Sequence, residues 1–375
     1  MKQTSLDIRL DSPFGSHALR RWPRRAGERL RAWDNADSLA LAAVAERGAQ
    51  RLLVVNDSHG ALSLPVADSL LGSAGDSWLS RRAIAENARD NALGWDDERQ
   101  WFWPDQTLPA QADLVVMRVP KSLSLFEYQL YCLGRDLPAG VPVLVAGMDK
   151  HLPDNLRPVM EHWLDDVHVG RGVRKARLFS GVTRGEATAA MKWPKTLTLP
   201  DQGWELTIHA GVFSGAKQDP GGRFLMRHVP EGVGGMIADL GCGNGMVGLL
   251  AAQRNPDARV IFCDESYQAI RSVRESAARC LPDGNLGFHL GNGLDRLDDT
   301  FDLILLNPPF HRGHAIDDGT ARMLFSHAKR QLKPGGELRV VGNRHLDYPR
   351  LLERSFGWVR QLAQDSRFVV LAAGK

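Results

Sequence analysis

The sequence predicts a doubly wound α/β fold in two tandem copies, on three observations: its length, its alternation of apolar and amphipathic segments, and an internal repeat. The chain has 375 residues, of which 43% are hydrophobic and 24% charged. This composition is typical of globular proteins, and the length suggests two domains. Because strands alternate with helices, we expect parallel sheets covered on both faces.

The second half of the chain shows the alternation most clearly. Buried strands are expected at residues 236–240, 259–263, 287–290, 301–306, 338–341 and 368–372. Helical spacing of apolar residues occurs at 246–254, 267–280 and 320–332. This half, from 200 to 375, is therefore expected to form one complete α/β domain.

The first half carries a weaker version of the same pattern, with expected strands at 51–55, 113–119 and 141–146. Residues 113–117 resemble 302–306, and Gly147 follows at a spacing similar to that of Gly342. We interpret this as a tandem duplication whose first copy, 1–195, lost its chemistry. A polar, proline-containing stretch at 187–202 is expected to link the copies.

Composition excludes several classes of protein. The 47 Lys and Arg residues are nearly balanced by 44 Asp and Glu, so the net charge of +3 does not indicate binding of nucleic acid by bulk charge. The 4 cysteines show neither zinc-ligand spacing nor a disulfide framework. Neither a signal peptide nor a membrane span is expected. The sequence favours a cytoplasmic protein without an obligate protein partner.

A glycine-rich turn follows the expected strand at 236–240. It consists of Asp239, Gly241, Gly243, Asn244 and Gly245. Glycines here let a ligand lie against the backbone, and a helix N-terminus follows. An acidic residue before the glycines would repel a pyrophosphate and attract an ammonium group. The next strand ends in Asp264, whose carboxylate can accept both hydroxyls of a ribose.

The most informative residues come directly after the strand at 301–306. They are Asn307, Pro308, Pro309 and Phe310. The prolines stiffen the backbone, and the Asn307 amide oxygen and the Pro308 carbonyl are two acceptors for a planar NH₂ group. Phe310 offers a stacking face for its ring. Acceptors that hold both N–H bonds stabilise the positive charge that develops as such a nitrogen is alkylated.

The glycine motif and Asp264 resemble class I S-adenosylmethionine-dependent methyltransferases, a resemblance that implies a Rossmann-like fold in both copies and S-adenosylmethionine as cofactor. In that family Asn292 occupies a position that contacts adenine, although a simple turn asparagine fits as well. The N-P-P-F sequence, which includes Asn307, resembles methyltransferases that alkylate exocyclic or amide nitrogens. They act on adenine, on release-factor glutamine or on the 2-amino group of guanine.

Further patterns at 209–214, 219–225, 311–315 and 343–348 resemble the bacterial ribosomal RNA guanine-N(2) methyltransferases of the RsmC and RlmG kind, and the large-subunit enzymes more than the small-subunit ones. The resemblance implies methylation of a guanine 2-amino group in 23S ribosomal RNA by the second copy. It also implies a non-catalytic first copy that stabilises the chain and contacts RNA. Because the base must be unpaired or flipped out, free or partly assembled RNA is the expected substrate.

Basic residues suggest where RNA would bind. The candidates are Arg20, Arg21, Arg24, Arg25, Arg171, Arg174, Lys175, Arg223 and His311. A solvated charged face explains these runs equally well. The histidines lack ligand spacing, so no metal is expected.

Alternative functions stay open at this point. The chain could methylate small-subunit ribosomal RNA or a release-factor glutamine, or it could be a non-catalytic RNA-binding assembly factor. The intact motif at Asn307 argues against an assembly factor. A nicotinamide dehydrogenase is disfavoured by both Asp239 and Asn307.

Overall fold

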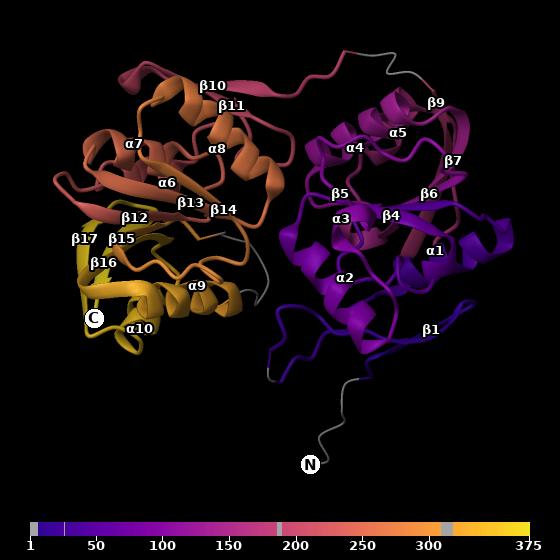
Figure 1. Ribbon diagram of the computed structural model, residues 1–375, viewed down its shortest axis with the longest axis horizontal. Helices are drawn as coiled ribbons and strands as arrows, with labels where there is room; N and C mark the ends of the chain where they lie inside the picture. Colours follow the sequence, from indigo (N-terminus) through magenta and orange to yellow (C-terminus); the bar gives the residue numbers. More distant parts are fainter. Residues whose placement is uncertain (1–6, 26, 186–189, 309–317) are drawn as a thin grey trace. The chain divides into compact units, whose positions relative to one another are not determined.

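The computed structural model describes residues 7–25, 27–185, 190–308 and 318–375. The chain divides into two compact units, Met1–Lys192 and Trp193–Lys375 (Figure 1). Each has its own seven-stranded sheet with helices on both faces. Within the described ranges, no helix is long and apolar enough to span a bilayer.

The sheet of the second unit has the order β14-β13-β12-β15-β16-β18-β17. Its strands are β12 (Gly235–Leu240), β13 (Ala258–Asp264), β14 (Leu286–Leu290), β15 (Phe301–Leu306), β16 (Leu332–Asn343), β17 (Trp358–Gln364) and β18 (Phe368–Gly374). The first five are parallel, whereas β18 runs antiparallel between β16 and β17. The expectation of a purely parallel sheet is therefore wrong at this edge.

Helices cover both faces of this sheet. They are α6 (Pro220–Met226), α7 (Met246–Arg254), α8 (Tyr267–Cys280), α9 (Asp318–Gln331) and α10 (Tyr348–Glu353). Neighbouring residues of β12 point to opposite faces: Ile237 joins the apolar cluster under α6, α7 and α8, and Ala238 joins the cluster under α9 and α10. This alternation is that of a strand buried on both sides.

A two-stranded antiparallel hairpin, β10 (Lys195–Leu199) and β11 (Trp204–Ile208), precedes the sheet. It packs on α8, where the backbone N–H of Thr207 donates to the hydroxyl of Ser276 at 2.9 Å. The stretch 187–202 was expected to be a link, and this is wrong for its second part, because β10 lies there. Its alternating Lys-Thr-Leu-Thr-Leu pattern is that of a half-buried strand.

The first unit repeats this architecture, with the sheet order β5-β4-β3-β6-β7-β9-β8. Its strands are β1 (Arg9–Ser12), β2 (Gly15–Ala18), β3 (Leu52–Val55), β4 (Leu70–Ala74), β5 (Trp101–Phe102), β6 (Leu114–Arg118), β7 (Ala139–Met148), β8 (Leu164–Val169) and β9 (Ala176–Arg184). Its helices are α1 (Asn35–Arg47), α2 (Trp78–Asp90), α3 (Asp97–Gln100), α4 (Leu123–Asp136) and α5 (Leu156–Trp163). The duplicated α/β fold is confirmed.

Strand register aligns the two copies residue by residue. Val55 of β3 pairs with Met117 of β6, as Leu240 of β12 pairs with Leu306 of β15. The repeated segments 113–117 and 302–306 begin with aspartates that make the same contact in the two units. The Asp113 carboxylate accepts from the backbone N–H of Arg51, and the Asp302 carboxylate accepts from that of Met236. Each bond ties the start of one central strand to the next.

Candidate active site

The predicted site residues of the second unit lie at the carboxyl ends of its central strands. β12 is paired on one side with β13 and on the other with β15. The strand order therefore reverses at β12, and ligands of doubly wound sheets bind beside such a reversal. The glycine turn follows β12, Asp264 ends β13, and Asn307 follows β15.

The glycine turn requires glycine for two reasons. Gly241, Gly243 and Gly245 all have positive φ, at 74°, 52° and 78°. At Gly245 a Cβ atom would also lie 2.6 Å from Val273 of α8. The turn therefore passes tightly over α8 before α7 begins. Because its glycines have no side chains, a ligand can bind directly against the main-chain atoms at the N-terminus of α7.

Asp239 is buried within β12, with a side chain only 4% exposed. Its Oδ2 accepts from the backbone N–H of Gly248 in α7 at 2.9 Å. Burial raises the pKa of this carboxyl to about 7, and the nearby charge of Asp264 adds to the rise. Burial disfavours the ionised form of this carboxyl, and a nearby cation would stabilise that form. This environment fits the ammonium group expected there.

Asp264 closes the other side of the glycine turn. Its Oδ2 accepts from the backbone N–H of Gly243 at 2.9 Å and its Oδ1 from that of Ser266, also at 2.9 Å. Burial raises its pKa. The acids on neighbouring strands and the bare glycine backbone between them fit S-adenosylmethionine, which carries an ammonium group and a ribose with two hydroxyls.

The predicted cofactor set also contains three asparagines, Asn244, Asn292 and Asn307, of which the first two are buried. The Oδ1 of Asn244 accepts from the backbone N–H of Met246 at 3.3 Å, at the start of α7. The Nδ2 of Asn292 donates to Asp295 at 2.9 Å. The neighbouring Gly291 N–H donates to the carbonyl of Asp264, so Asn292 lies beside the end of β13. Its role in adenine binding stays a prediction.

Asn307 has one satisfied and one unsatisfied end. Its Nδ2 donates to Oδ2 of Asp219 at 3.0 Å, while its buried Oδ1 has no hydrogen-bond partner among the described residues. A buried acceptor without a partner is costly and is rarely kept without a reason. Pro308 is buried beside it. Pro309, Phe310 and His311 lie outside the described residues.

Asp219 is a residue to which the sequence interpretation gave no role. It caps α6 by accepting from the backbone N–H of Gly222 at 2.6 Å, with Pro220 in the first turn. An aspartate followed by proline before a helix is a readable capping signal. The signal does not reveal that the same carboxylate reaches Asn307, which lies far away in the sequence.

The equivalent positions of the first unit contain different side chains. Arg118, the last residue of β6, stands at the position of Asn307, which follows β15. It donates from Nη2 to Asp34 at 2.9 Å and from Nη1 to Asp37. Asp34 is the N-cap residue of α1, as Asp219 is of α6. Burial raises the pKa of Asp37 to about 6. Arg118 itself therefore offers no acceptor in the place of the Asn307 amide oxygen.

Three of the predicted RNA-contact residues lie in ion pairs, and two of these three, Arg20 and Arg24, are also exposed. Arg20 and Arg24 both donate to Asp90, and Arg21 lies 3.7 Å from Glu28. These pairs show a structural use for that cluster. The remaining candidates are all exposed in the described structure: Arg25, Arg171, Arg174, Lys175 and Arg223.

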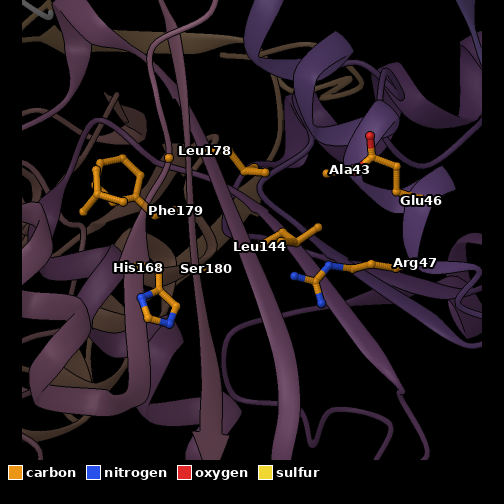
Figure 2. Close-up of a pocket in the computed structure, with 10 residues that line it drawn as sticks. Ala43, Glu46, Arg47, Leu144, His168, Leu178, Phe179 and Ser180 are labelled. Carbon is orange, nitrogen blue, oxygen red and sulfur yellow. The ribbon is translucent and has the colours of Figure 1, made fainter.

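The exposed turn between β8 and β9, residues 170–175, lies next to a groove of about 440 Å³ on the first unit. Figure 2 shows Arg47 of α1 and His168 of β8 on either side of Leu144. The groove also includes Gly170, the first residue of the turn. Among the described residues, no cluster of His, Cys, Asp or Glu side chains is arranged to hold a metal ion.

Comparison with known proteins gives matches along the whole chain. The sequence profile described as "Methyltransferase small domain" matches residues 203–372, and the one described as "RLMG N-terminal domain" matches residues 7–186. "Ribosomal RNA large subunit methyltransferase G" of Alcanivorax borkumensis is 45% identical over 96% of this chain and 95% of its own length. The protein of that name from Klebsiella pneumoniae is 39% identical over 95% and 96%.

Among solved structures, the T. thermophilus 16S rRNA N2 methyltransferase RsmC, in complex with AdoMet and guanosine, aligns with a TM-score of 0.77. The alignment covers 98% of this chain and 97% of that one, at 24% sequence identity. At this level of identity the match establishes a shared fold over both units.

Proposed function

This chain belongs to the ribosomal RNA large subunit methyltransferase G family, and on that premise we propose that it methylates the 2-amino group of a guanine in 23S ribosomal RNA. It is an S-adenosylmethionine-dependent enzyme, and its second unit carries out the transfer. The observation that carries the proposal is the buried Oδ1 of Asn307, for which the described residues provide no hydrogen-bond partner. It lies after β15, next to the strand that bears Asp239.

When bound, the cofactor would supply an electrophilic methyl group on a sulfonium sulfur, which is a good leaving group. Asp239 and Asp264 would hold its ammonium and ribose groups. The Asn307 oxygen and the Pro308 carbonyl would accept the two N–H bonds of the amino group. These acceptors favour a nitrogen lone pair aimed at the methyl group and stabilise the charge that develops. The product then loses one proton to water.

The substrate is proposed to be protein-free or partly assembled large-subunit RNA. A guanine 2-amino group inside a folded helix is not accessible to a site at a sheet edge, so the base must be unpaired or flipped out. Early RNA offers such bases at lower cost than a mature subunit. Of the two basic groups in the first unit, the turn at 170–175 supports RNA contact better, because Arg20 and Arg24 of the other group are paired with Asp90. Arg171, Arg174 and Lys175 are all exposed.

The first experiment is methyl transfer from radiolabelled S-adenosylmethionine by the purified protein. Protein-free 23S RNA, protein-free 16S RNA and intact subunits are compared, followed by nucleoside analysis. We expect 2-methylguanosine in 23S RNA, with less in the intact large subunit. Label in 16S RNA alone, or no label in any RNA with label in a release factor, would contradict the proposal.

RNA contact by the exposed turn has its own test. Replacement of Arg171, Arg174 and Lys175 by alanine should weaken 23S RNA binding severalfold and lower the salt dependence of binding. The matched control is Arg20→Ala, because Arg20 is already paired with Asp90. Equal RNA affinity and salt dependence in the triple variant and the wild type would remove the turn from the interface.

A further inference from the structure

The Asn307 amide is held by a carboxylate from a different part of the chain. Oδ2 of Asp219 accepts from Asn307 Nδ2 at 3.0 Å and from the backbone N–H of Gly222 at 2.6 Å. The second bond anchors the carboxylate to the first turn of α6. The α6 helix in turn packs on β16 and β18 through a buried Leu225. Asp219 is thus placed by the fold and does not depend on Asn307 for its position.

An asparagine side chain has a donor end and an acceptor end, and rotation by 180° about its last bond exchanges them. An ionised carboxylate can only accept. Asp219 therefore selects the orientation in which the NH₂ group faces α6 and Oδ1 faces away from it. That oxygen is the buried acceptor without a partner among the described residues.

We propose that Asp219 is a positioning residue that fixes the Asn307 amide with its oxygen toward the target amino group. The inference rests on the proposed function, because an amino group is the partner that needs this oxygen. Without Asp219 the amide could turn its NH₂ group toward the substrate. Two NH₂ groups would then face each other, and the acceptor for the developing positive charge would be lost.

The first unit supports this inference independently. Asp34 caps α1 and binds the last residue of β6, and Asp219 caps α6 and binds the residue at the equivalent position, directly after β15. In the first unit that residue is Arg118, which has only donors. The capping carboxylate is thus present in both copies, whereas only the second copy pairs it with a side chain that still offers an acceptor.

The test is Asp219→Ser. Serine is a good N-cap residue, so α6 keeps its capping bond, but its hydroxyl both donates and accepts and no longer selects one amide orientation. We expect kcat on 23S RNA to fall about tenfold to a hundredfold. The cofactor Kd and the KM for RNA should stay within about twofold of the wild-type values. The matched control is Asp34→Ser, the same change at the equivalent cap, which should leave kcat unchanged.

A second measurement separates orientation from general damage to α6. In an Asn307→Ala background, Asp219→Ser should cause no further loss of kcat, because the amide it orients is gone. A full additional loss in that background, or an unchanged kcat in the single variant, would overturn the inference. The Asn307 side-chain NH₂ signal in a ¹H–¹⁵N NMR spectrum should shift in Asp219→Ser but not in Asp34→Ser.

Failure of the proposed function gives a different result. A wild-type enzyme that methylates no RNA overturns that function directly. The amide signal still reports in that case whether Asp219 orients Asn307, and an unshifted signal overturns the inference by itself.

Discussion

The two units share one fold and differ at nearly every position where chemistry is expected. Register places Val54 of the first unit at the position of Asp239, and Gly75 at that of Asp264. Both of the carboxylates predicted to bind the cofactor are therefore missing from the first copy. A Cβ atom at Gly75 would lie 3.0 Å from Trp101, so an aromatic ring lies beside the position equivalent to Asp264.

The glycine turn has also been converted into a closed structure. The Asp57 carboxylate, 1% exposed, accepts from the backbone N–H groups of residues 59–63 and from the Ser63 hydroxyl. One carboxylate thus binds the whole turn, whereas in the second unit the N–H groups of Met246 and Gly248 are bound by two different side chains. The described residues 61–69 between this turn and β4 form no α-helix, whereas α7 follows Gly245 directly.

Features that both units share serve the fold, whereas the positions that differ are those predicted to serve the reaction. Gly60 has φ of 87° where Gly245 has 78°, and Asp113 makes the same strand contact as Asp302. These shared features hold the sheet together. The positions that differ are the predicted ligand contacts of the second unit, and in the first unit they hold side chains of other kinds, so the same fold forms without the predicted site.

The largest effect is expected from removing the Asp57 side chain, which binds the turn of the first unit that corresponds to the glycine turn. Asp57→Ala should lower the free energy of unfolding of the first unit by about 3 kcal/mol or more, because several buried N–H groups lose a charged acceptor together. Scanning calorimetry measures this. Cofactor affinity of the second unit should not change. A loss below about 1 kcal/mol would mean that the turn is not held by Asp57.

The next largest effect belongs to the strand-end residue. Asn307→Ala should leave cofactor binding nearly intact and lower turnover on 23S RNA by about 10²-fold or more, as expected for loss of one charge-stabilising contact. Single-turnover methyl transfer measures it. The control is Arg118→Ala at the equivalent position, which should leave turnover unchanged. A decrease of less than about threefold would remove Asn307 from the reaction.

Much of this comparison could be predicted from the sequence. Local patterns gave helices α7 and α8 with their bounds, because buried parallel strands and amphipathic helices have distinct apolar spacing. The edge strand β17 was missed, since its sequence Trp-Val-Arg-Gln-Leu-Ala-Gln has mostly exposed or half-buried side chains and no apolar run. The antiparallel pairing of β18 with β16 and β17 was missed as well.

Site residues could be predicted from the sequence where a local pattern, such as the end of a buried strand, marks their position. Asp239, Asp264 and Asn307 could be predicted as site residues because each lies at or next to the end of a recognisable strand. The contact of Asp219 with Asn307 was not found, because it depends on how α6 packs against the sheet. The closure by Asp57 was missed for a similar reason, since only the folded turn brings its donors to one carboxylate.

A smaller effect is expected at the ribose position. Asp264→Ala should weaken S-adenosylmethionine binding about tenfold to a hundredfold, since it removes a charged acceptor and also frees the backbone N–H groups of Gly243 and Ser266. Isothermal calorimetry measures the change. Asp283→Ala, at an exposed acid of the same unit, is the control. Unchanged affinity in Asp264→Ala would remove that residue from the ribose contact.

The smallest effect is a pH dependence that Asp239 should give the second unit and that Val54 cannot give the first. Burial raises the pKa of Asp239 to about 7 from its ordinary value of 3.8. Only the ionised carboxylate attracts an ammonium group, so cofactor affinity should fall by up to about tenfold between pH 8 and pH 6. Calorimetric titration across this range measures it, and Asp239→Asn should remove the slope.

The same carboxyl should act on stability with the opposite sign. Its pKa is higher in the folded than in the unfolded state, so its contribution to the stability of the ligand-free protein is full below about pH 4 and is lost as pH rises through about 7. The difference in unfolding free energy between the wild type and Asp239→Asn isolates this contribution from other titrating groups. Affinity and stability that change in the same direction with pH would show that Asp239 does not carry the charge that binds the cofactor.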